Sequence, residues 1–367
     1  MLSINITQNL FPSFHNDERL LIFYSFIAKL SRISIHVEFW LSIFGGILTI
    51  FHFLVLTRKA MKSTSIISLM ISVAICDFLS MIVSISSKDM ILNFYGSDCT
   101  PPNSFLTFQI FWVLMSIRDG VVRCSTWLTV LMALIRFLVS KYASEVRYQK
   151  MSMFIFGFKS SAFSVFISSL MSSCFYLCIK FVEIGTWTPA NCCTNIPLDS
   201  QFPLYEQRVS DLFSLYDGAP VQIFQFINGI FSKLIPCIIL PLLTTLLVVE
   251  LKRTEKSRIS SSVLYKNNTE KTTNLVIIMT FSIFLASLPT GIATVFQVIY
   301  SDLGFLFIYI NVDAICDTLL LWNASTNCFI CFLMSSQYRN TAKKLLKIKV
   351  HVNNNHLIGT PLRRTTT

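Results

Sequence analysis

The stretch FLFIYINVDAICDTLLLWNASTNCFICFLM, residues 305–334, decides the fold of this chain. It is almost continuously apolar, and an α-helix needs only about 20 such residues to cross the roughly 30 Å hydrocarbon core of a bilayer. Two asparagines, Asn323 and Asn327, stand one helical turn apart near its end. Polar groups at bilayer depth are costly and usually serve function. We therefore predict a transmembrane helix with a functional polar face.

Six further apolar runs precede this stretch. Of the 367 residues, 53% are hydrophobic and 13% are charged, which is too apolar a composition for one soluble domain. The six runs lie at residues 37–57, 65–87, 106–140, 158–181, 222–250 and 273–300. The fold class predicted from these runs is an all-α membrane protein, a seven-transmembrane helix bundle over residues 37–335.

The residues on either side of the bundle are expected to lie in water or at the membrane surface. Residues 1–36 are predicted to form an extracellular N-terminal tail, in which Leu20–Ile35 is apolar but carries Lys29 and Arg32. We expect an interfacial helix there rather than an eighth span. Residues 336–367 are predicted to form a short amphipathic helix, with apolar and basic faces, followed by a cytoplasmic tail.

Lysine and arginine are concentrated in alternate links between the runs. The links after the first, third and fifth runs and the C-terminal tail are basic, whereas the other links are acidic. The positive-inside rule places the basic links and the C-terminus in the cytoplasm and the N-terminus outside the plasma membrane. The net charge of +11 reflects this asymmetry, and no nucleic acid partner is implied. Asn5 begins a glycosylation sequon on the predicted outer side.

Most of the eleven cysteines fall inside the apolar runs, where they are expected to act as small buried hydrophobes. Only Cys99, Cys192 and Cys193 lie in the predicted exterior, which is oxidising. We predict a disulfide from Cys99 to Cys192 or to Cys193, and the sequence does not choose between them.

Polar residues inside the apolar runs outline an axis through the bundle. Ser125 follows Arg118 by seven residues and Arg136 follows Ser125 by eleven, so the three share one helix face, with the two arginines about 27 Å apart. We use the name mid-membrane cluster for the four polar residues that can meet if the helices pack together: Asp77, Ser125, Asn323 and Asn327. One carboxylate and several neutral oxygens could hold a small cation or a proton; the alternative is a hydrogen-bonded packing core without a ligand.

A second polar set lies in the outer half of the bundle and suggests a ligand pocket. Its members are Arg118, Asp119, Lys233, Gln297, Asp313 and Asp317. In one interpretation Arg118 binds an anionic group, such as a peptide carboxylate. In the other, Arg118 or Arg123 pairs internally with Asp119 or Asp317, because buried charges need partners.

Several short motifs resemble those of rhodopsin-like G-protein-coupled receptors. They are AICD at residues 74–77, STWL at 125–128, ALIR at 133–136, LP at 288–289, and NASTN at 323–327 followed by MSSQYR at 334–339. Together they cover about residues 37–345, and the pattern is similar to the nematode serpentine receptors of class W, relatives of FMRFamide-type peptide receptors.

This resemblance implies roles for individual residues. The mid-membrane cluster would hold Na⁺ in the resting state. Arg136 would contact the G protein, Pro289 would be the hinge about which the sixth span bends on activation, and Arg118 would face the ligand. The chain departs from the family pattern where relatives carry switch residues: at Ile135, Ser287, Cys328 and Cys331.

The sequence therefore predicts a receptor that binds an extracellular ligand, a FMRFamide-like neuropeptide, and activates a heterotrimeric G protein. One alternative is a chemosensory receptor for an environmental small molecule, and another is a pseudo-receptor that does not signal, because of the altered switch residues. A transporter would be expected to show repeated halves with broken helices, and no such repeat is found in the sequence. No HExxH or G-x-S-x-G motif occurs, so no enzyme activity, catalytic metal or cofactor other than Na⁺ is expected.

Overall fold

The structure is a computed structural model that describes residues 10–15, 17–62, 64–94, 100–142, 144–189, 197, 199–257, 281, 283–300 and 302–346. The elements are η2 (Pro12–Phe14), α2 (Glu18–Leu56), α3 (Ser65–Phe94), α4 (Phe105–Lys141), α5 (Val146–Met151), α6 (Phe154–Leu177), β1 (Ile179–Trp187), β2 (Phe202–Val209), α7 (Leu215–Gly229), η3 (Ile230–Leu234), α8 (Ile235–Ser257), α10 (Leu303–Met334) and α11 (Ser336–Leu345). A further apolar helix covers Ile283–Ile299, between α8 and α10.

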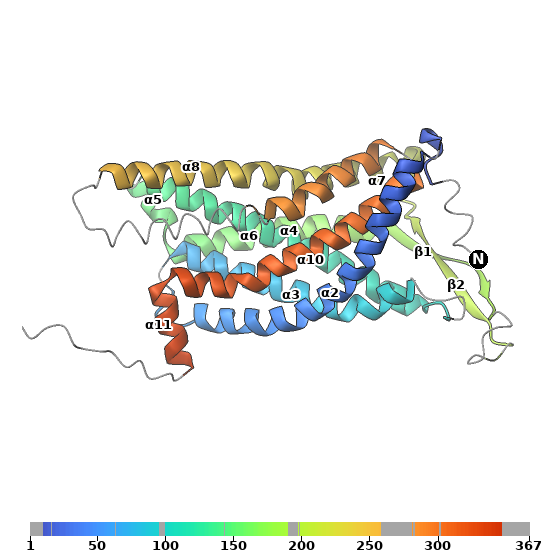
Figure 1. Cartoon of the computed structure of the whole chain (residues 1–367), viewed down its shortest axis with the longest axis horizontal. Helices are drawn as coiled ribbons and strands as arrows, with labels where there is room; N and C mark the ends of the chain where they lie inside the picture. Colours follow the sequence, from blue (N-terminus) through green and yellow to red (C-terminus); the bar gives the residue numbers. More distant parts are fainter. Residues whose placement is uncertain are drawn as a thin grey trace, which may run out of the picture.

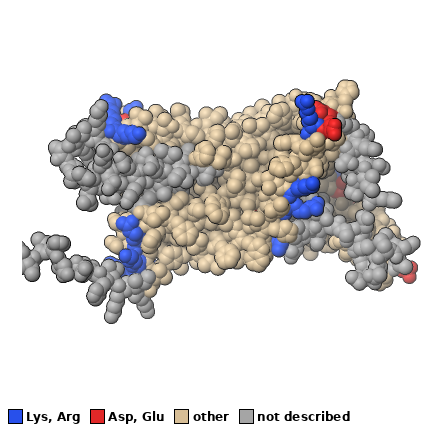
Figure 2. Space-filling model, viewed as in Figure 1, with Lys and Arg blue, Asp and Glu red and all other residues tan. Residues whose placement is uncertain are grey.

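The long helices run side by side along the longest axis of the molecule (Figure 1). In the described part of the chain, six helical segments are long and apolar enough to cross a bilayer, with α7, η3 and α8 counted as one. The shorter apolar helix Ile283–Ile299 is the seventh rod, so the predicted seven-transmembrane bundle is confirmed. On the visible face the charged side chains gather toward the two ends, leaving a broad uncharged band between them (Figure 2). Such a band is what contact with lipid requires.

The first helix differs from the prediction. Residues 20–35, expected to form a separate interfacial helix, are instead continuous with the first span in α2, a helix of 39 residues. Asp17 begins this helix, because its carboxylate accepts a hydrogen bond from the backbone N–H of Arg19 (2.9 Å). Buried serines at positions 31 and 34 show that this segment already packs on the bundle, so Lys29 and Arg32 do not interrupt the helix.

The end of the bundle that the charge distribution predicts to lie outside the cell, which we name the outer end (and the opposite end the inner end), carries a β-hairpin that the all-α prediction did not include. Strands β1 and β2 pair antiparallel from Ile179–Val209 to Trp187–Phe202, with an irregularity between Glu183 and Gly185. Several of the pairing residues are β-branched or aromatic, types that favour strands, among them Val182, Tyr205 and Trp187. Figure 1 shows the hairpin at the opposite end of the long axis from α5 and α11.

The segment before α2 packs on the outer end of α10. The hydroxyl of Ser13 donates a hydrogen bond to Asp302 (2.8 Å), and the backbone N–H of Gly304 donates to the carbonyl of Leu10 (2.8 Å). Phe11 is fully buried, and its ring occupies the space that a Cβ on Gly304 would need. These contacts fix the outer end of α10, which carries much of the candidate site.

One turn of π-helix interrupts the fifth span. Pro236 lies just after η3 and has no backbone N–H, so the regular hydrogen-bond ladder of the helix cannot continue through it. The widened turn contains Ser232, which is buried and points toward α4, as its hydrogen bond to Arg123 shows. The local break thus supplies a polar side chain to the bundle interior.

Candidate functional site

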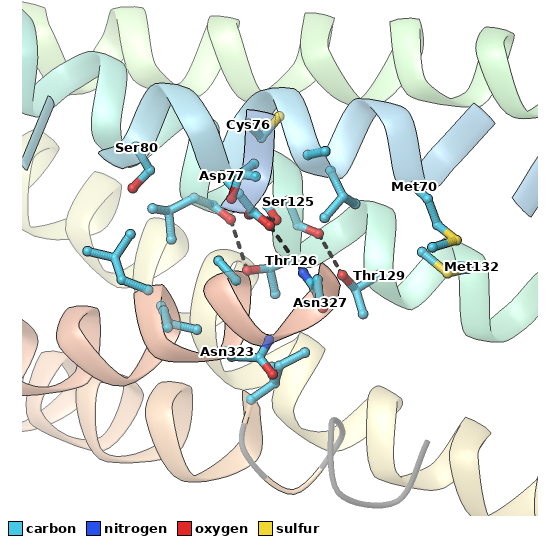
Figure 3. A pocket seen from close by; sticks show the side chains of 18 of the residues that line it. Met70, Cys76, Asp77, Ser80, Ser125, Thr126, Thr129, Met132, Asn323 and Asn327 are labelled. Carbon is cyan, nitrogen blue, oxygen red and sulfur yellow. Dashed lines mark hydrogen bonds between the residues drawn. The ribbon is translucent and has the colours of Figure 1, made fainter. Parts of the chain in front are cut away.

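The carboxylate of Asp77 is the centre of a hydrogen-bonded group in the middle of the bundle (Figure 3). Ser125 of α4 donates to its Oδ1 (2.8 Å), and the Nδ2 of Asn327 of α10 donates to its Oδ2 (3.3 Å). Asp77 itself lies on α3 and is buried. Three helices that are far apart in the sequence therefore meet at one carboxylate, as the predicted polar axis requires.

A cavity of about 160 Å³ surrounds this group and is lined by all four residues of the mid-membrane cluster. Asn323 lines it one helical turn before Asn327, as Figure 3 shows. In the described part of the chain, the side-chain oxygen of Asn327 is buried and has no hydrogen-bond partner. A carboxylate, a hydroxyl and an unpaired amide oxygen form a set of hard oxygen ligands, which suits a small hard cation. The residues present therefore fit the Na⁺ that the resemblance implies.

The outer end of the same cavity is closed by an ion-paired group. Arg118 of α4, which is 9% exposed, pairs with Glu38 of α2 and with Asp317 of α10, whose Oδ2 lies 3.1 Å from its Nη2. The second interpretation of Arg118, internal pairing with Asp317, is therefore the arrangement found in the structure. Glu38 was missed by the sequence analysis, because it is the second residue of the predicted run 37–57 and could equally have lain at the water interface.

Arg123 is the second buried arginine of α4, with 1% of its surface exposed. It pairs with Asp119 one turn earlier, so that Asp119 does not pair with Arg118. Its other donors bind the hydroxyl of Ser232 (2.7 Å), the backbone carbonyl of Ser168 (3.0 Å) and the amide oxygen of Asn228 (3.0 Å). One guanidinium thus joins α4 to α6, α7 and η3.

The remaining residues of the predicted pocket lie nearby. Lys233 of η3 lies 3.5 Å from Asp313 of α10, a longer separation than in the three ion pairs of Arg118 and Arg123. Gln297, on the helix Ile283–Ile299, is half-buried and makes no hydrogen bond to these charged groups within the described residues. The structure therefore gathers five of the six predicted pocket residues into ion pairs.

Arg136 lines the inner end of the cavity. No ion pair or hydrogen bond of its guanidinium is found among the described residues, although Cys331 lies close enough for an electrostatic interaction. Ile135, one of the four positions at which the chain departs from the family pattern, is buried in an apolar cluster with Leu69 and Leu128. This neighbour of Arg136 is apolar and offers its guanidinium no counter-charge.

The inner ends of α2, α10 and α11 meet at a buried tyrosine. The hydroxyl of Tyr338 lies 2.9 Å from Nδ1 of His52 and 3.5 Å from the thiol of Cys328. Tyr338 is almost completely buried. The sequence analysis quoted Tyr338 only as part of a motif and did not find His52, because a lone histidine in an apolar run carries no partner signal.

Some predicted positions are not described. Cys99, Cys192, Cys193 and Asn5 lie outside the described residues, so the disulfide and the glycosylation site remain predictions. Pro289 lies within the helix Ile283–Ile299, where it interrupts the hydrogen-bond ladder, and its role as a hinge also remains a prediction.

Comparison with known proteins agrees with this arrangement. The G-protein coupled receptor dmsr-1 of Caenorhabditis elegans is 22% identical over 347 residues, which is 83% of this chain and 66% of that receptor. The chain thus spans just under two thirds of the length of this relative. The sequence profile of the family described as serpentine type 7TM GPCR chemoreceptor Srw matches residues 36–349, from the end of the first predicted tail to beyond α11. With seven apolar rods, a polar axis and a family match over most of its length, the chain belongs to the Srw family of serpentine seven-transmembrane G-protein-coupled chemoreceptors.

Proposed function

We propose that this protein is a plasma-membrane receptor that binds an extracellular peptide and activates a heterotrimeric G protein. The observation that carries the proposal is the cavity between Arg118 and Arg136, which links an outer charged group to an inner arginine through the mid-membrane cluster. A ligand that changes the packing at the outer end can shift the equilibrium between two states of the whole bundle, and the G protein at the inner end then responds to that shift. In this proposal the N-terminus is extracellular and residues 336–367 are cytoplasmic.

A peptide ligand is supported by the resemblance to FMRFamide-type receptors. The hairpin of β1 and β2 at the outer end also offers an exposed surface on which an extended ligand could lie. The second candidate is a receptor for an environmental small molecule, which the family's description as chemoreceptors favours.

The first test is a screen of amidated peptides and of volatile and water-soluble small molecules in cells that carry a promiscuous G protein. We expect a peptide to raise the second messenger, and Arg136→Ala to reduce that response to near background at equal surface expression. Arg136 has no ion pair within the described residues, so the substitution should leave folding unchanged.

The matched control is Lys141→Ala, an exposed basic residue five positions further along α4, which should keep the response. A full response from Arg136→Ala would contradict the proposed coupling. A response to small molecules alone would select the second candidate. Silence toward every compound would identify a receptor that reaches the membrane but does not signal.

A further expected result concerns Na⁺ at the mid-membrane cluster. Asp77 supplies the charge, and the unpaired oxygen of Asn327 supplies a further ligand atom. The melting temperature of the purified receptor should therefore be higher in sodium chloride than in choline chloride at equal ionic strength. Asp77→Asn should abolish this difference, whereas Asp211→Asn, which removes a loop carboxylate that is 88% exposed, should preserve it. The same sodium dependence in Asp77→Asn would place the ion elsewhere.

A further inference from the structure

The ion pairs at the outer end of the bundle do not balance. We use the name outer charged cluster for seven described residues that lie in contact or in electrostatic range: Glu38, Arg118, Asp119, Arg123, Lys233, Asp313 and Asp317. Three of them are bases and four are acids, so their formal charge is +3 − 4 = −1. The cluster therefore has one carboxylate more than it has cations.

The pairing pattern locates the excess negative charge. Arg123 is matched by Asp119, and Lys233 lies nearest to Asp313, whereas Arg118 is shared between Glu38 and Asp317. The side chains of Glu38 and Asp317 are only 8% and 12% exposed, so water solvates them poorly. A buried charge without full compensation is strongly unfavourable. A further cation at this point would stabilise the bundle.

The spacing of two acids on α10 shows where that cation would bind. Asp313 and Asp317 are four residues apart and so lie on the same face of the helix, where like charges repel. The side chain of Asp313 is 31% exposed and its pair with Lys233 is the longest of the cluster, at 3.5 Å. A cation arriving from the outer end therefore meets Asp313 before Asp317.

A buried donor beside the two acids indicates that the occupant also carries an oxygen. In the described part of the chain, the Nε of Arg118 is buried without a hydrogen-bond partner. Arg118 and Asp317 both line the cavity, and the Nη2 of the same guanidinium lies 3.1 Å from Asp317. A buried unsatisfied donor costs free energy that an acceptor from a ligand would recover.

We propose that Asp313 and Asp317 bind a cationic group of the ligand, a guanidinium or an ammonium, while the Nε of Arg118 donates to an oxygen of the same molecule. This inference rests on the proposed receptor function and names the chemistry of its ligand. It is the reverse of the first interpretation of Arg118, an anionic ligand group, because Glu38 and Asp317 already pair with that arginine. A guanidinium suits the site because it can bind a carboxylate through two parallel hydrogen bonds.

The test uses the purified full-length receptor and two small probes of nearly the same shape, one cationic and one neutral. N-acetyl-arginine amide has a guanidinium and amide oxygens, and N-acetyl-citrulline amide is its neutral near-isostere. At about ten times its dissociation constant the arginine probe should raise the melting temperature by about 3 °C, and the citrulline probe should have no effect.

Receptor variants assign the effect to the site. Asp317→Asn and Asp313→Asn should each abolish the shift in melting temperature. Because Asp313 is partly exposed, Asp313→Asn still tests the site if Asp317→Asn does not fold. Asp211→Asn is the matched control and should keep the shift, because its carboxylate is exposed in a loop. Equal stabilisation by the citrulline probe or in both aspartate variants would overturn the proposal, as would the absence of any shift.

This readout does not depend on signalling. If the arginine probe stabilises the receptor but the G-protein assay is silent, the cation site is supported and the proposed coupling is contradicted. If the receptor responds to peptides but the arginine probe causes no shift in melting temperature, the proposed function is supported and the cation site is contradicted.

Discussion

Replacing Arg123 by alanine is expected to lower the free energy of unfolding by about 3–5 kcal/mol, the range typical of breaking a buried ion pair. The substitution leaves Asp119 without its counter-charge and removes the donors that satisfy Ser232, Asn228 and the backbone of Ser168. Because the lost contacts join α4 to three neighbouring segments, the whole bundle should be affected. The melting temperature in detergent and the amount of receptor at the cell surface are the two measurements.

The matched control is Arg208→Ala. Arg208 lies on β2 and pairs with Glu206, but its side chain is 57% exposed, so the change should cost no more than about 0.5 kcal/mol. Comparable surface expression and melting temperatures in the two variants would show that the Arg123 contacts contribute little to stability.

The second large effect is expected at Gly157, where α6 lies directly against α3. A Cβ at this position would stand 2.4 Å from the backbone carbonyl oxygen of Ser65 and 2.9 Å from its Cα. Backbone atoms cannot rotate away, so Gly157→Ala must separate the two helices, at a cost of about 1–3 kcal/mol. Thermal unfolding of the purified variant measures this cost.

Gly46→Ala provides the comparison. A Cβ at Gly46 meets nothing nearer than the ring of Phe78 at 4.0 Å, which is ordinary contact distance. Since alanine is also the better helix former, this variant should be as stable as the parent or slightly more so. If Gly157→Ala proves equally well tolerated, the two helices do not pack as closely as described.

Residue type and spacing were sufficient to find the mid-membrane cluster. Asp77, Ser125 and Asn327 are polar residues within apolar runs, and a polar group at bilayer depth has few partners other than its counterparts on neighbouring helices. Their hydrogen bonds to one carboxylate follow from that constraint. The ion pairs of the outer charged cluster could not be predicted from the sequence, because the cluster contains several acids and bases that could pair in more than one way.

Glu38 illustrates the difference. It lies at the outer end of the first predicted span, where a sequence cannot distinguish a residue at the water interface from one that turns inward. Only the packing of α2 against α10 brings it within reach of Arg118, and this contact agrees with the second interpretation of Arg118, internal pairing. The π turn of η3 is a similar case, since Pro236 signals a break in the helix but not which neighbour receives Ser232.

The sequence by itself determined the number of membrane-spanning rods and the family, because the apolar runs reflect the thickness of the bilayer and the motifs hold their places along the chain. It also identified the residues of the central polar axis. Only the tertiary structure decided that α2 is one continuous helix, which acid neutralises which base, and how tightly α6 approaches α3. These outcomes depend on the rotation of each helix about its own axis, which is set by the packing of whole faces against one another rather than by local sequence.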